Sequence, residues 1–186
     1  MIEDVRKIIR TATLELLQTK DYKDVQMKEI AETAHVGRRT LYRYFGCKDE
    51  IMTSVVDCLM DDLADIINQN GRLDLEGIAY AFFVFWEKNL DILRLLKKAH
   101  LMYILEDNMP ELVNGVALKT KYKGKTELEL KEIKNSFTVE GTYNYYYMLA
   151  GYIKVAQVWM EEENRRTPEE MAKILKGIVT RDFPGM

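Results

Sequence analysis

Residues 27–46, with the sequence MKEIAETAHVGRRTLYRYFG, decide the fold that we expect for the N-terminal part of this chain. Within 27–34 the apolar side chains recur at the spacing of one face of a short helix. Residues 35–37 break this pattern, and a second short helix is predicted over 38–44. Two short helices joined by a tight turn are the pattern of a helix-turn-helix.

A longer amphipathic helix precedes this pair and completes a three-helix module over residues 1–47. The small side chain of Ala31 lets the two short helices cross closely, and Val36 and Leu41 supply apolar contacts between them. The pattern alone also fits any small helical hairpin with a basic exposed face. The apolar stripe of the first helix consists of Val5, Ile8, Ile9, Ala12 and Leu16.

The charge of the chain is distributed unevenly. The 186 residues carry a net charge of −3, which by itself does not indicate nucleic-acid binding. Between Glu32 and Asp49, however, every charged side chain is basic. Such a local basic patch can bind phosphate while the rest of the chain stays soluble. The basic residues of this patch are Arg38, Arg39, Arg43 and Lys48.

The rest of the chain is predicted to be helical as well, because only three prolines occur in it. A fourth helix is expected from about Lys48 to Asn70, and further helices over 73–89 and 91–107. A loop or a frayed helix end is expected over 115–126. The last two helices are expected over 143–162 and after Thr167, which is a typical N-cap residue. We therefore expect an all-α chain of about nine helices.

The N-terminal region resembles the DNA-binding domain of the tetracycline-repressor (TetR) family. The last helix pair is similar to the dimerisation pair of this family. The resemblance implies a helix-turn-helix DNA-binding domain over 1–47 and a helical ligand-sensing and dimerisation domain over 48–186. The matching residues are Ile30-Ala31, Val36, Thr40-Leu41-Tyr42-Arg43-Tyr44-Phe45, Lys48, Asp49-Glu50 and Ile51.

Three residues depart from the family pattern. Gln26 stands where serine or threonine usually caps the second helix, and glutamine is a poorer cap that can still donate to a phosphate. His35 replaces a common turn glycine, and Gly37 stands where a serine often caps the recognition helix. We expect these changes to affect local stability more than the basic face.

The resemblance implies a DNA-reading role that the chemistry of the residues also supports. The second helix of such a motif enters the major groove, where arginine can donate two hydrogen bonds to guanine, so a half-site that contains guanine is expected. Tyr42, Tyr44 and Lys48 are predicted to contact the DNA backbone. The candidate DNA-binding residues are Gln26, Lys28, Arg38, Arg39, Thr40, Tyr42, Arg43, Tyr44 and Lys48.

The resemblance also implies that a ligand in the C-terminal domain shifts the fourth helix and changes the spacing of two DNA-reading heads. Aromatic side chains offer apolar faces, and tyrosines add hydroxyls, so we expect an aromatic or amphiphilic effector. Each of these aromatic residues could instead belong to the core or to a dimer interface. The candidate ligand-binding residues are Phe82, Phe85, Trp86, Tyr103, Phe137, Tyr143, Tyr146 and Tyr147.

The last two helices are expected to form a four-helix interface with their symmetry mates in a homodimer. Small residues allow close helix approach, and a tryptophan can anchor an interface. The candidate interface residues are Ala150, Gly151, Val155, Trp159, Ile174 and Ile178.

The function that we expect is a ligand-responsive transcriptional regulator. It is expected to repress, to bind a palindromic operator in double-stranded DNA as a dimer, and to be released by a small-molecule effector. A helical adaptor that has lost DNA binding and a small all-helical enzyme are the alternatives. The chain contains no HExxH, Gly-rich phosphate loop or GxSxG element, so we expect no enzyme, cofactor or metal site. No secretory signal or membrane span is evident, which predicts a cytoplasmic protein.

Overall fold

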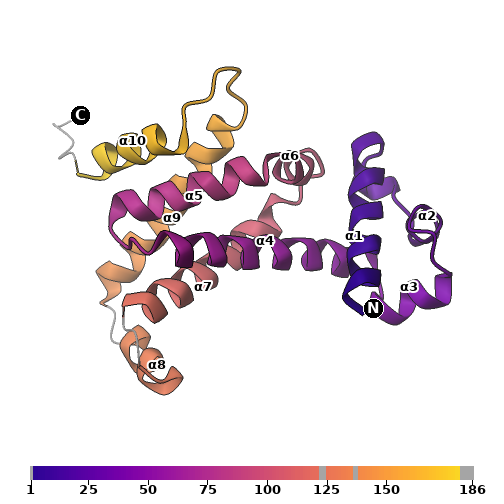
Figure 1. Cartoon of the computed structure of the whole chain (residues 1–186), viewed down its shortest axis with the longest axis horizontal. Coiled ribbons are helices and arrows are strands. Elements are labelled where there is room, and N and C mark those ends of the chain that lie inside the picture. Colours follow the sequence, from indigo (N-terminus) through magenta and orange to yellow (C-terminus); the bar gives the residue numbers. More distant parts are fainter. Residues whose placement is uncertain (1, 122–124, 136–137, 181–186) are drawn as a thin grey trace. The chain divides into compact units, whose positions relative to one another are not determined.

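Every regular element that the structure describes is a helix (Figure 1). The computed structural model describes residues 2–121, 125–135 and 138–180, and the side chains of residues 5–113, 125–132 and 138–180. The expectation of an all-α fold is confirmed. These ranges contain ten α-helices and one short 3-10 turn, where we expected about nine helices.

The described helices form two compact units. The unit that we call the head contains the residues up to Leu59 and Asp91–Leu105, and the body contains Met60–Leu90 and the residues from Glu106 onward. The functional division after residue 47 is a different boundary and stays a prediction. The helices are α1 (Ile2–Thr19), η1 (Tyr22–Asp24), α2 (Met27–Thr33), α3 (Arg38–Tyr44), α4 (Lys48–Asn70), α5 (Leu75–Lys88), α6 (Leu90–Lys98), α7 (Met102–Lys121), α8 (Glu127–Asn135), α9 (Val139–Trp159) and α10 (Pro168–Thr180).

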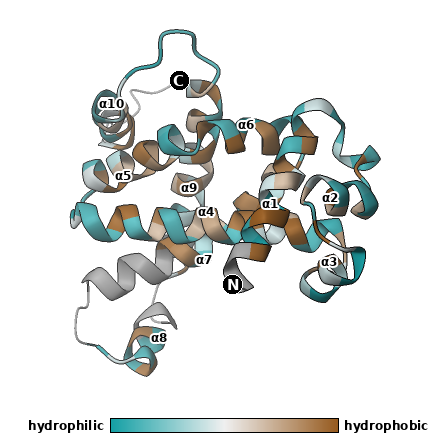
Figure 2. Cartoon of the chain, turned by 45° about the vertical axis from the view of Figure 1, so that its right-hand side comes forward, coloured by the Kyte–Doolittle hydropathy of each residue, from teal (hydrophilic) through white to brown (hydrophobic). Residues whose placement is uncertain are grey.

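The core of the head forms where α1 packs on α2 and α2 packs on α3. Ile9, Ile30 and Leu41 are fully buried there, and hydrophobic residues line α1 in Figure 2. The buried face of α1 differs from the predicted stripe, because Ile8 is 47% exposed. Thr13 is buried instead, and its hydroxyl donates to the carbonyl of Ile9 (2.9 Å), so no polar atom of this side chain is left without a partner.

The turn between α2 and α3 contains a histidine with a left-handed backbone. His35 has a φ of 53°. Its N–H donates to the carbonyl of Glu32 (3.1 Å), and the N–H of Val36 donates to that of Ala31 (3.0 Å). These two bonds close α2 as a Schellman motif, in which glycine is the usual left-handed residue. The turn position where the family commonly has glycine therefore does require a positive φ.

The second histidine of the chain ends α6 in the same way. His100 has a φ of 58°. Its N–H donates to the carbonyl of Lys97 (3.1 Å), and the N–H of Leu101 donates to that of Leu96 (2.8 Å). Leu96 and Leu101 are both buried, as the apolar contact of this motif requires.

The body is built around α5, against which α10 packs closely (Figure 1). Helix α5 begins at Asp74, whose carboxylate accepts from the N–H of Gly77 (2.7 Å). A side chain at Gly77 would meet the carbonyl oxygen of Arg72 at 2.7 Å from its Cβ, so only glycine fits there. The core side chains of α5 are Ala79, Ala81, Phe82, Phe83, Phe85 and Trp86.

Helix α10 begins with the cap that the sequence predicts. The N–H of Glu170 donates to the hydroxyl of Thr167 (3.3 Å), and the N–H of Thr167 donates to the carboxylate of Glu170 (2.9 Å). This reciprocal pair is a capping box, and Pro168 occupies the first helical position, where no N–H is needed.

Helix α9 is the most apolar helix near the C-terminal end, and its sequence predicts burial on more than one side. Within this chain only one face is buried, and the opposite face is exposed. The buried face of α9 consists of Leu149, Tyr152, Ile153, Ala156 and Trp159.

No helix among the described residues is long and apolar enough to cross a membrane.

We expect His100→Gly to raise the free energy of unfolding by about 1 kcal/mol, because glycine adopts a positive φ without a Cβ clash. Urea unfolding followed by circular dichroism measures this change. Ala99→Gly is the matched control, since Ala99 has no positive φ and glycine there only adds backbone entropy to the unfolded chain. A loss of stability in both variants would contradict the strain that we assign to His100.

Candidate functional site

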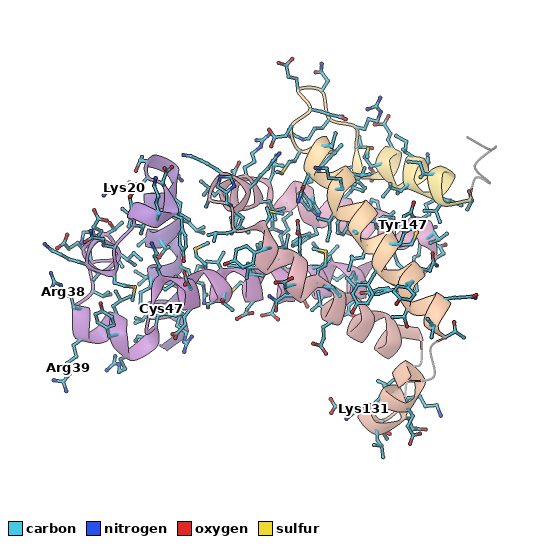
Figure 3. All side chains as sticks on the ribbon, turned by 180° about the vertical axis from the view of Figure 1, so that it is seen from behind. Lys20, Arg38, Arg39, Cys47, Lys131 and Tyr147 are labelled. Carbon is cyan, nitrogen blue, oxygen red and sulfur yellow. The ribbon has the colours of Figure 1, made fainter. Side chains whose placement is uncertain are left out.

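Helix α3 presents its basic residues on the side opposite the core. Leu41 and the following Phe45 are buried, which turns Arg38, Arg39 and Arg43 outward as exposed side chains. Figure 3 shows Arg38 and Arg39 extending from α3 into solvent. The helix contains no acidic residue. Three cationic side chains are therefore available to an anionic partner on one short helix.

Arg43 is held by its neighbour rather than fully free. Its guanidinium carbon lies 5.0 Å from the ring centroid of Tyr44, and one guanidinium nitrogen donates to the Tyr44 hydroxyl (3.4 Å). From α1, Arg6 lies over the rings of Phe45 (5.1 Å) and Tyr44 (5.9 Å). Tyr44 is thus half-buried and orients two arginines, whereas Tyr42 is 55% exposed. Thr40 is half-buried on the same helix.

The start of α2 carries the other two candidates for DNA contact. Gln26 is the N-cap residue, and its backbone N–H donates to the carboxylate of Glu29 (3.1 Å). Lys20 also donates to Glu29, and this hydrogen bond is the main reason that the pKa of Glu29 is lowered. Lys28 is exposed and lies 3.8 Å from Glu32, a loose pair that a phosphate could replace.

Lys48 has a different environment from the one that the sequence predicts. Its ammonium group donates to the carbonyls of Tyr22 (2.6 Å), Lys23 (3.2 Å) and Val25 (3.2 Å), and it lies 4.5 Å from the centroid of the Tyr22 ring. All three N–H bonds of the ammonium are therefore used within the head. The sequence does not reveal these contacts, because the carbonyls lie more than 20 residues from Lys48; the phosphate contact of Lys48 stays a prediction.

A second bond reinforces this arrangement. The hydroxyl of Tyr22 donates to the carboxylate of Asp49. Burial, followed by this hydrogen bond to an anion, raises the pKa of Tyr22 well above its usual range. Lys48 and Asp49 together attach the first turn of α4 to η1, and we call this group of contacts with Tyr22 the α4 clamp.

We expect Lys48→Met to lower the free energy of unfolding by about 2 kcal/mol, because it leaves half-buried carbonyls without their charged donor. Urea denaturation of the full chain measures the loss. Lys28→Met is the matched control and should change the stability by less than about 0.5 kcal/mol, since its ion pair is exposed. If Lys48→Met keeps the stability of the chain but binds DNA more weakly, the result would support a contact between Lys48 and a phosphate.

Three of the predicted ligand-binding residues form one aromatic core in the body. Phe82, Phe85 and Trp86 are all buried. The ring centroid of Phe82 lies 5.8 Å from that of Trp86 and 5.8 Å from that of Tyr152 on α9. Phe83 extends this cluster toward Trp159 (5.2 Å). The cluster has the low polarity that an apolar ligand would require, and it is closely packed.

The other predicted ligand-binding residues do not join this cluster. Tyr143, Tyr146 and Tyr147 are exposed on α9, because they fall on the helix face opposite Tyr152 or at its edge. Tyr103 is exposed in the head. The candidate at position 137, Phe137, lies outside the described residues. Sequence reasoning could not separate these groups, since tyrosine is equally compatible with core and surface.

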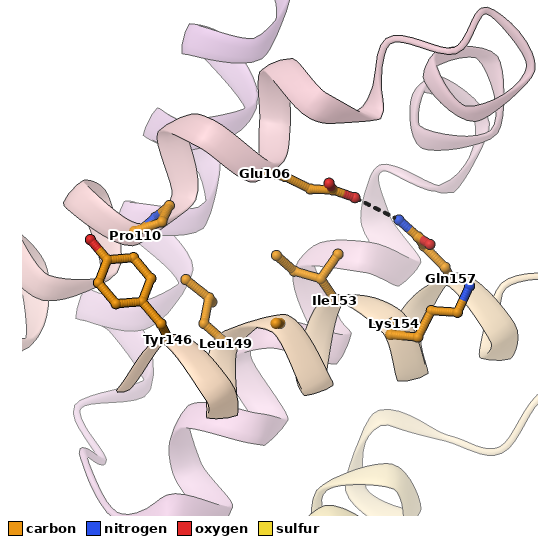
Figure 4. Close-up of a pocket in the computed structure, with 8 residues that line it drawn as sticks. Glu106, Pro110, Tyr146, Leu149, Ile153, Lys154 and Gln157 are labelled. Carbon is orange, nitrogen blue, oxygen red and sulfur yellow. Dashed lines mark hydrogen bonds between the residues drawn. The ribbon is translucent and has the colours of Figure 1, made fainter. Parts of the chain in front are cut away.

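A shallow groove lies between α7 and α9, with a volume of about 220 Å³ (Figure 4). At one end the amide of Gln157 donates to the carboxylate of Glu106 (3.0 Å). Sequence reasoning missed this groove, whose signals are Pro110 inside an apolar helix and polar residues spaced along α9. The residues that line it are Glu106, Pro110, Tyr146, Leu149, Ala150, Ile153, Lys154 and Gln157.

The predicted dimer-interface residues divide into an exposed and a buried set. Ala150 and Gly151 on α9 are exposed, as are Ile174 and Ile178 on α10. Val155 is half-buried. Trp159 is only 1% exposed and packs in the body, where its indole N–H donates to the carbonyl of Arg166 (2.9 Å). The large ring of Trp159 thus fills the core of its own chain, and its role as a dimer anchor stays a prediction.

A basic α3 that follows α2 through a tight turn, supported by α1, defines the head as that of a helix-turn-helix DNA-binding protein. Residues 9–55 match the family model described as bacterial regulatory proteins, tetR family. The N-terminal segment of the chain thus resembles the DNA-binding domain of TetR-family transcriptional regulators.

The curated relatives match part of this chain in sequence, and the solved structures match nearly all of it in fold. The activator of the dhaKLM operon of Lactococcus lactis, DhaS, is 32% identical over 65 residues, which are 35% of this chain and only 33% of that protein. A TetR regulator from Streptococcus agalactiae is 20% identical and covers 97% of this chain and 96% of its own, with a TM-score of 0.66. The fatty acid degradation regulator FadR from Bacillus halodurans is 15% identical, covers 98% and 97%, and has a TM-score of 0.65. The two solved structures therefore show the same fold.

Proposed function

We propose that this regulator binds a palindromic operator as a homodimer, represses transcription there, and is released by a small-molecule effector. The single observation that carries the proposal is the exposed basic face of α3, with Arg38, Arg39 and Arg43 opposite a buried Leu41. An arginine can donate two parallel hydrogen bonds to the O6 and N7 atoms of guanine in the major groove. A half-site that contains guanine follows from this chemistry.

The contacts around α3 divide the candidate residues by role. Arg38 and Arg39 are exposed at the N-terminal end of α3, which reaches base edges in helix-turn-helix proteins. Tyr42 and Lys28 are exposed at positions suited to the phosphate backbone. The Tyr44 ring supports Arg43, so Tyr44 acts through that arginine.

The exposed faces of α9 and α10 support the homodimer. Isoleucines at 174 and 178 are 40% and 46% exposed, which leaves apolar surface on α10 uncovered in the single chain. A side chain at Gly151 would meet nothing within 4 Å, so this position of α9 leaves room for a second helix. Two such faces related by two-fold symmetry would form a four-helix interface and present two heads to successive major grooves, about 34 Å apart.

Helix α4 supports the proposed coupling between effector and DNA. It contributes Ile51 and Val55 to the core of the head and Leu63 and Ile67 to that of the body. A displacement of this continuous helix would therefore act on both cores, and the coupling should be reciprocal. The relative DhaS is named an activator, whereas we propose repression for this chain. A reporter gene with the operator in its promoter distinguishes the two directions of regulation.

We expect Arg38→Ala and Arg39→Ala each to weaken binding to the selected operator by about 1–3 kcal/mol and to relax the preference at one base pair, because each removes a base contact. Operator sequences are first selected by the purified protein from a random DNA pool. Fluorescence anisotropy across a salt series then measures affinity and specificity.

Lys28→Ala is the matched control for this experiment. It should weaken binding to all sequences alike and reduce the salt slope by about one, as expected for a lost phosphate contact. Binding that is indifferent to both arginines would contradict base reading by α3. No enrichment of any sequence would contradict the regulator proposal itself.

We expect Ile178→Glu to raise the dissociation constant of the dimer about a hundredfold, because a buried unpaired carboxylate costs about 3 kcal/mol or more. Sedimentation equilibrium measures the monomer–dimer distribution. Leu128→Glu on α8 is the matched control, since Leu128 is also exposed and lies outside the proposed interface. Equal dimerisation of both variants would show that α10 does not form the interface.

A further inference from the structure

Among the described side chains of the body, two buried polar atoms have no hydrogen-bond partner. They are the indole nitrogen Nε1 of Trp86 and the hydroxyl oxygen of Tyr152. Trp86 is fully buried, and Tyr152 is 7% exposed. Buried polar groups are nearly always paired, and an unpaired group destabilises the folded state. Two such atoms in one cluster therefore require an explanation.

Both atoms belong to rings that pack against the same phenyl ring. The centroid of Phe82 lies 5.8 Å from Trp86 on its own helix and 5.8 Å from Tyr152 on α9. By contrast, the second indole of the chain is satisfied, because Trp159 donates to the carbonyl of Arg166 at 2.9 Å. The lack of partners is thus confined to the surroundings of Phe82, within the part of the body that the structure describes.

The groove between α7 and α9 lies beside this cluster. Leu149 and Ile153, which line the groove, also belong to the buried face of α9 that carries Tyr152. The opposite wall contains Pro110, which cannot donate the helical hydrogen bond to the carbonyl of Glu106. This wall of the groove is therefore weaker than an uninterrupted helix, and small movements there would open a route from solvent to the Tyr152 ring. Figure 4 shows Pro110 facing Leu149 and Ile153 across the groove.

We propose that the aromatic cluster around Phe82 is the effector site, and that Trp86 Nε1 and the Tyr152 hydroxyl bind a single neutral acceptor group of an otherwise apolar ligand. The inference rests on the proposed function, because it names the site and the ligand class for the effector. The ligand enters from the groove and displaces apolar side chains on its way to the two atoms.

The chemistry of the two atoms sets the class of ligand. The indole N–H can only donate, and the phenol can donate or accept, so a carbonyl or hydroxyl oxygen satisfies both. Burial raises the pKa of Tyr152, which keeps its hydroxyl protonated as a donor. Among the described side chains the only buried polar residue is Thr13, which lies in the head. In the part of the body whose side chains are described, no buried cation would compensate an anionic ligand, so we propose an uncharged group.

The experiment uses the full chain labelled with ¹⁵N and three aromatic probes of similar size. Benzylacetone carries a neutral ketone, butylbenzene has no acceptor, and hydrocinnamate is anionic. The two indole N–H signals report the site directly, with Trp86 as the reporter and Trp159 as the internal reference. We expect benzylacetone to move the Trp86 signal downfield in a saturable manner and to leave the Trp159 signal unchanged.

Affinity and stability measurements with variants complete the test. Tyr152→Phe should weaken benzylacetone binding by about threefold to tenfold, the effect of one hydrogen bond, and should leave butylbenzene binding unchanged. Without ligand, the same variant should raise the melting temperature by about 2–4 °C, because it removes an unpaired hydroxyl. Tyr145→Phe should lower it, since Tyr145 donates to the carbonyl of Pro110 (2.6 Å). Tyr147→Phe, at an exposed position, is the matched control for binding.

Three results would overturn the inference. The first is a Trp86 signal that stays unmoved at the solubility limit of benzylacetone. The second is binding of butylbenzene or of hydrocinnamate as tight as that of the ketone. The third is a Tyr152→Phe variant that binds benzylacetone as Tyr147→Phe does. The operator complex distinguishes this failure from failure of the proposed function. A ketone that fills the site without releasing operator DNA supports the site and contradicts effector release. Operator binding with an unmoved Trp86 signal supports the regulator and contradicts the site.

Discussion

The geometry of the head depends on the α4 clamp, in which one ammonium group satisfies three backbone carbonyls. Helices α2 and α3 have only seven residues each, and helices of this length are not stable alone. Their position is set by the segment that leads out of α1, and Lys48 holds that segment through Tyr22, Lys23 and Val25. The clamp ties this segment to the first turn of α4. These contacts provide a direct connection from the first turn of α4 to the segment that leads into α2.

The core of the body is aromatic and apolar, but two polar atoms among its described side chains have no hydrogen-bond partner. The cost of leaving Trp86 Nε1 and the Tyr152 hydroxyl unpaired lowers the stability of the unliganded body. A regulator benefits from this arrangement, since a ligand that supplies the missing acceptor gains binding energy which an already satisfied core would not offer. The opposite face of α9 is exposed, so the proposed ligand site and the proposed dimer interface use different faces of this helix. In the proposed dimer the same helix would contribute its buried face to the ligand site and exposed residues such as Gly151 to the second chain.

Much of the fold could be predicted, and the reasons for the failures are specific. The pattern of residues 27–46 predicted α2, the turn and α3, because apolar periodicity and turn residues are local signals. The burial of Leu41 and Phe45 and the cap at Thr167 followed from the same local rules. The burial of Trp159 and the three carbonyl contacts of Lys48 could not be predicted, since they depend on packing between helices and on partners remote in sequence. The aromatic residues could not be divided into core and surface, because periodicity gives a helix its faces but not their neighbours.

The sequence by itself determined the helical content, the helix-turn-helix and the basic, acid-free segment that resembles the TetR DNA-binding domain. These properties depend on residues within one or two helical turns of each other. Only the tertiary structure decided which polar side chains are hydrogen-bonded within the chain. The ammonium group of Lys48 binds three carbonyls that lie more than 20 residues away in the chain. Trp86 and Tyr152 lie on two different helices, pack against the ring of Phe82, and keep their polar atoms unpaired. Whether a polar group is paired depends on distances between segments remote in sequence, and no local pattern contains those distances.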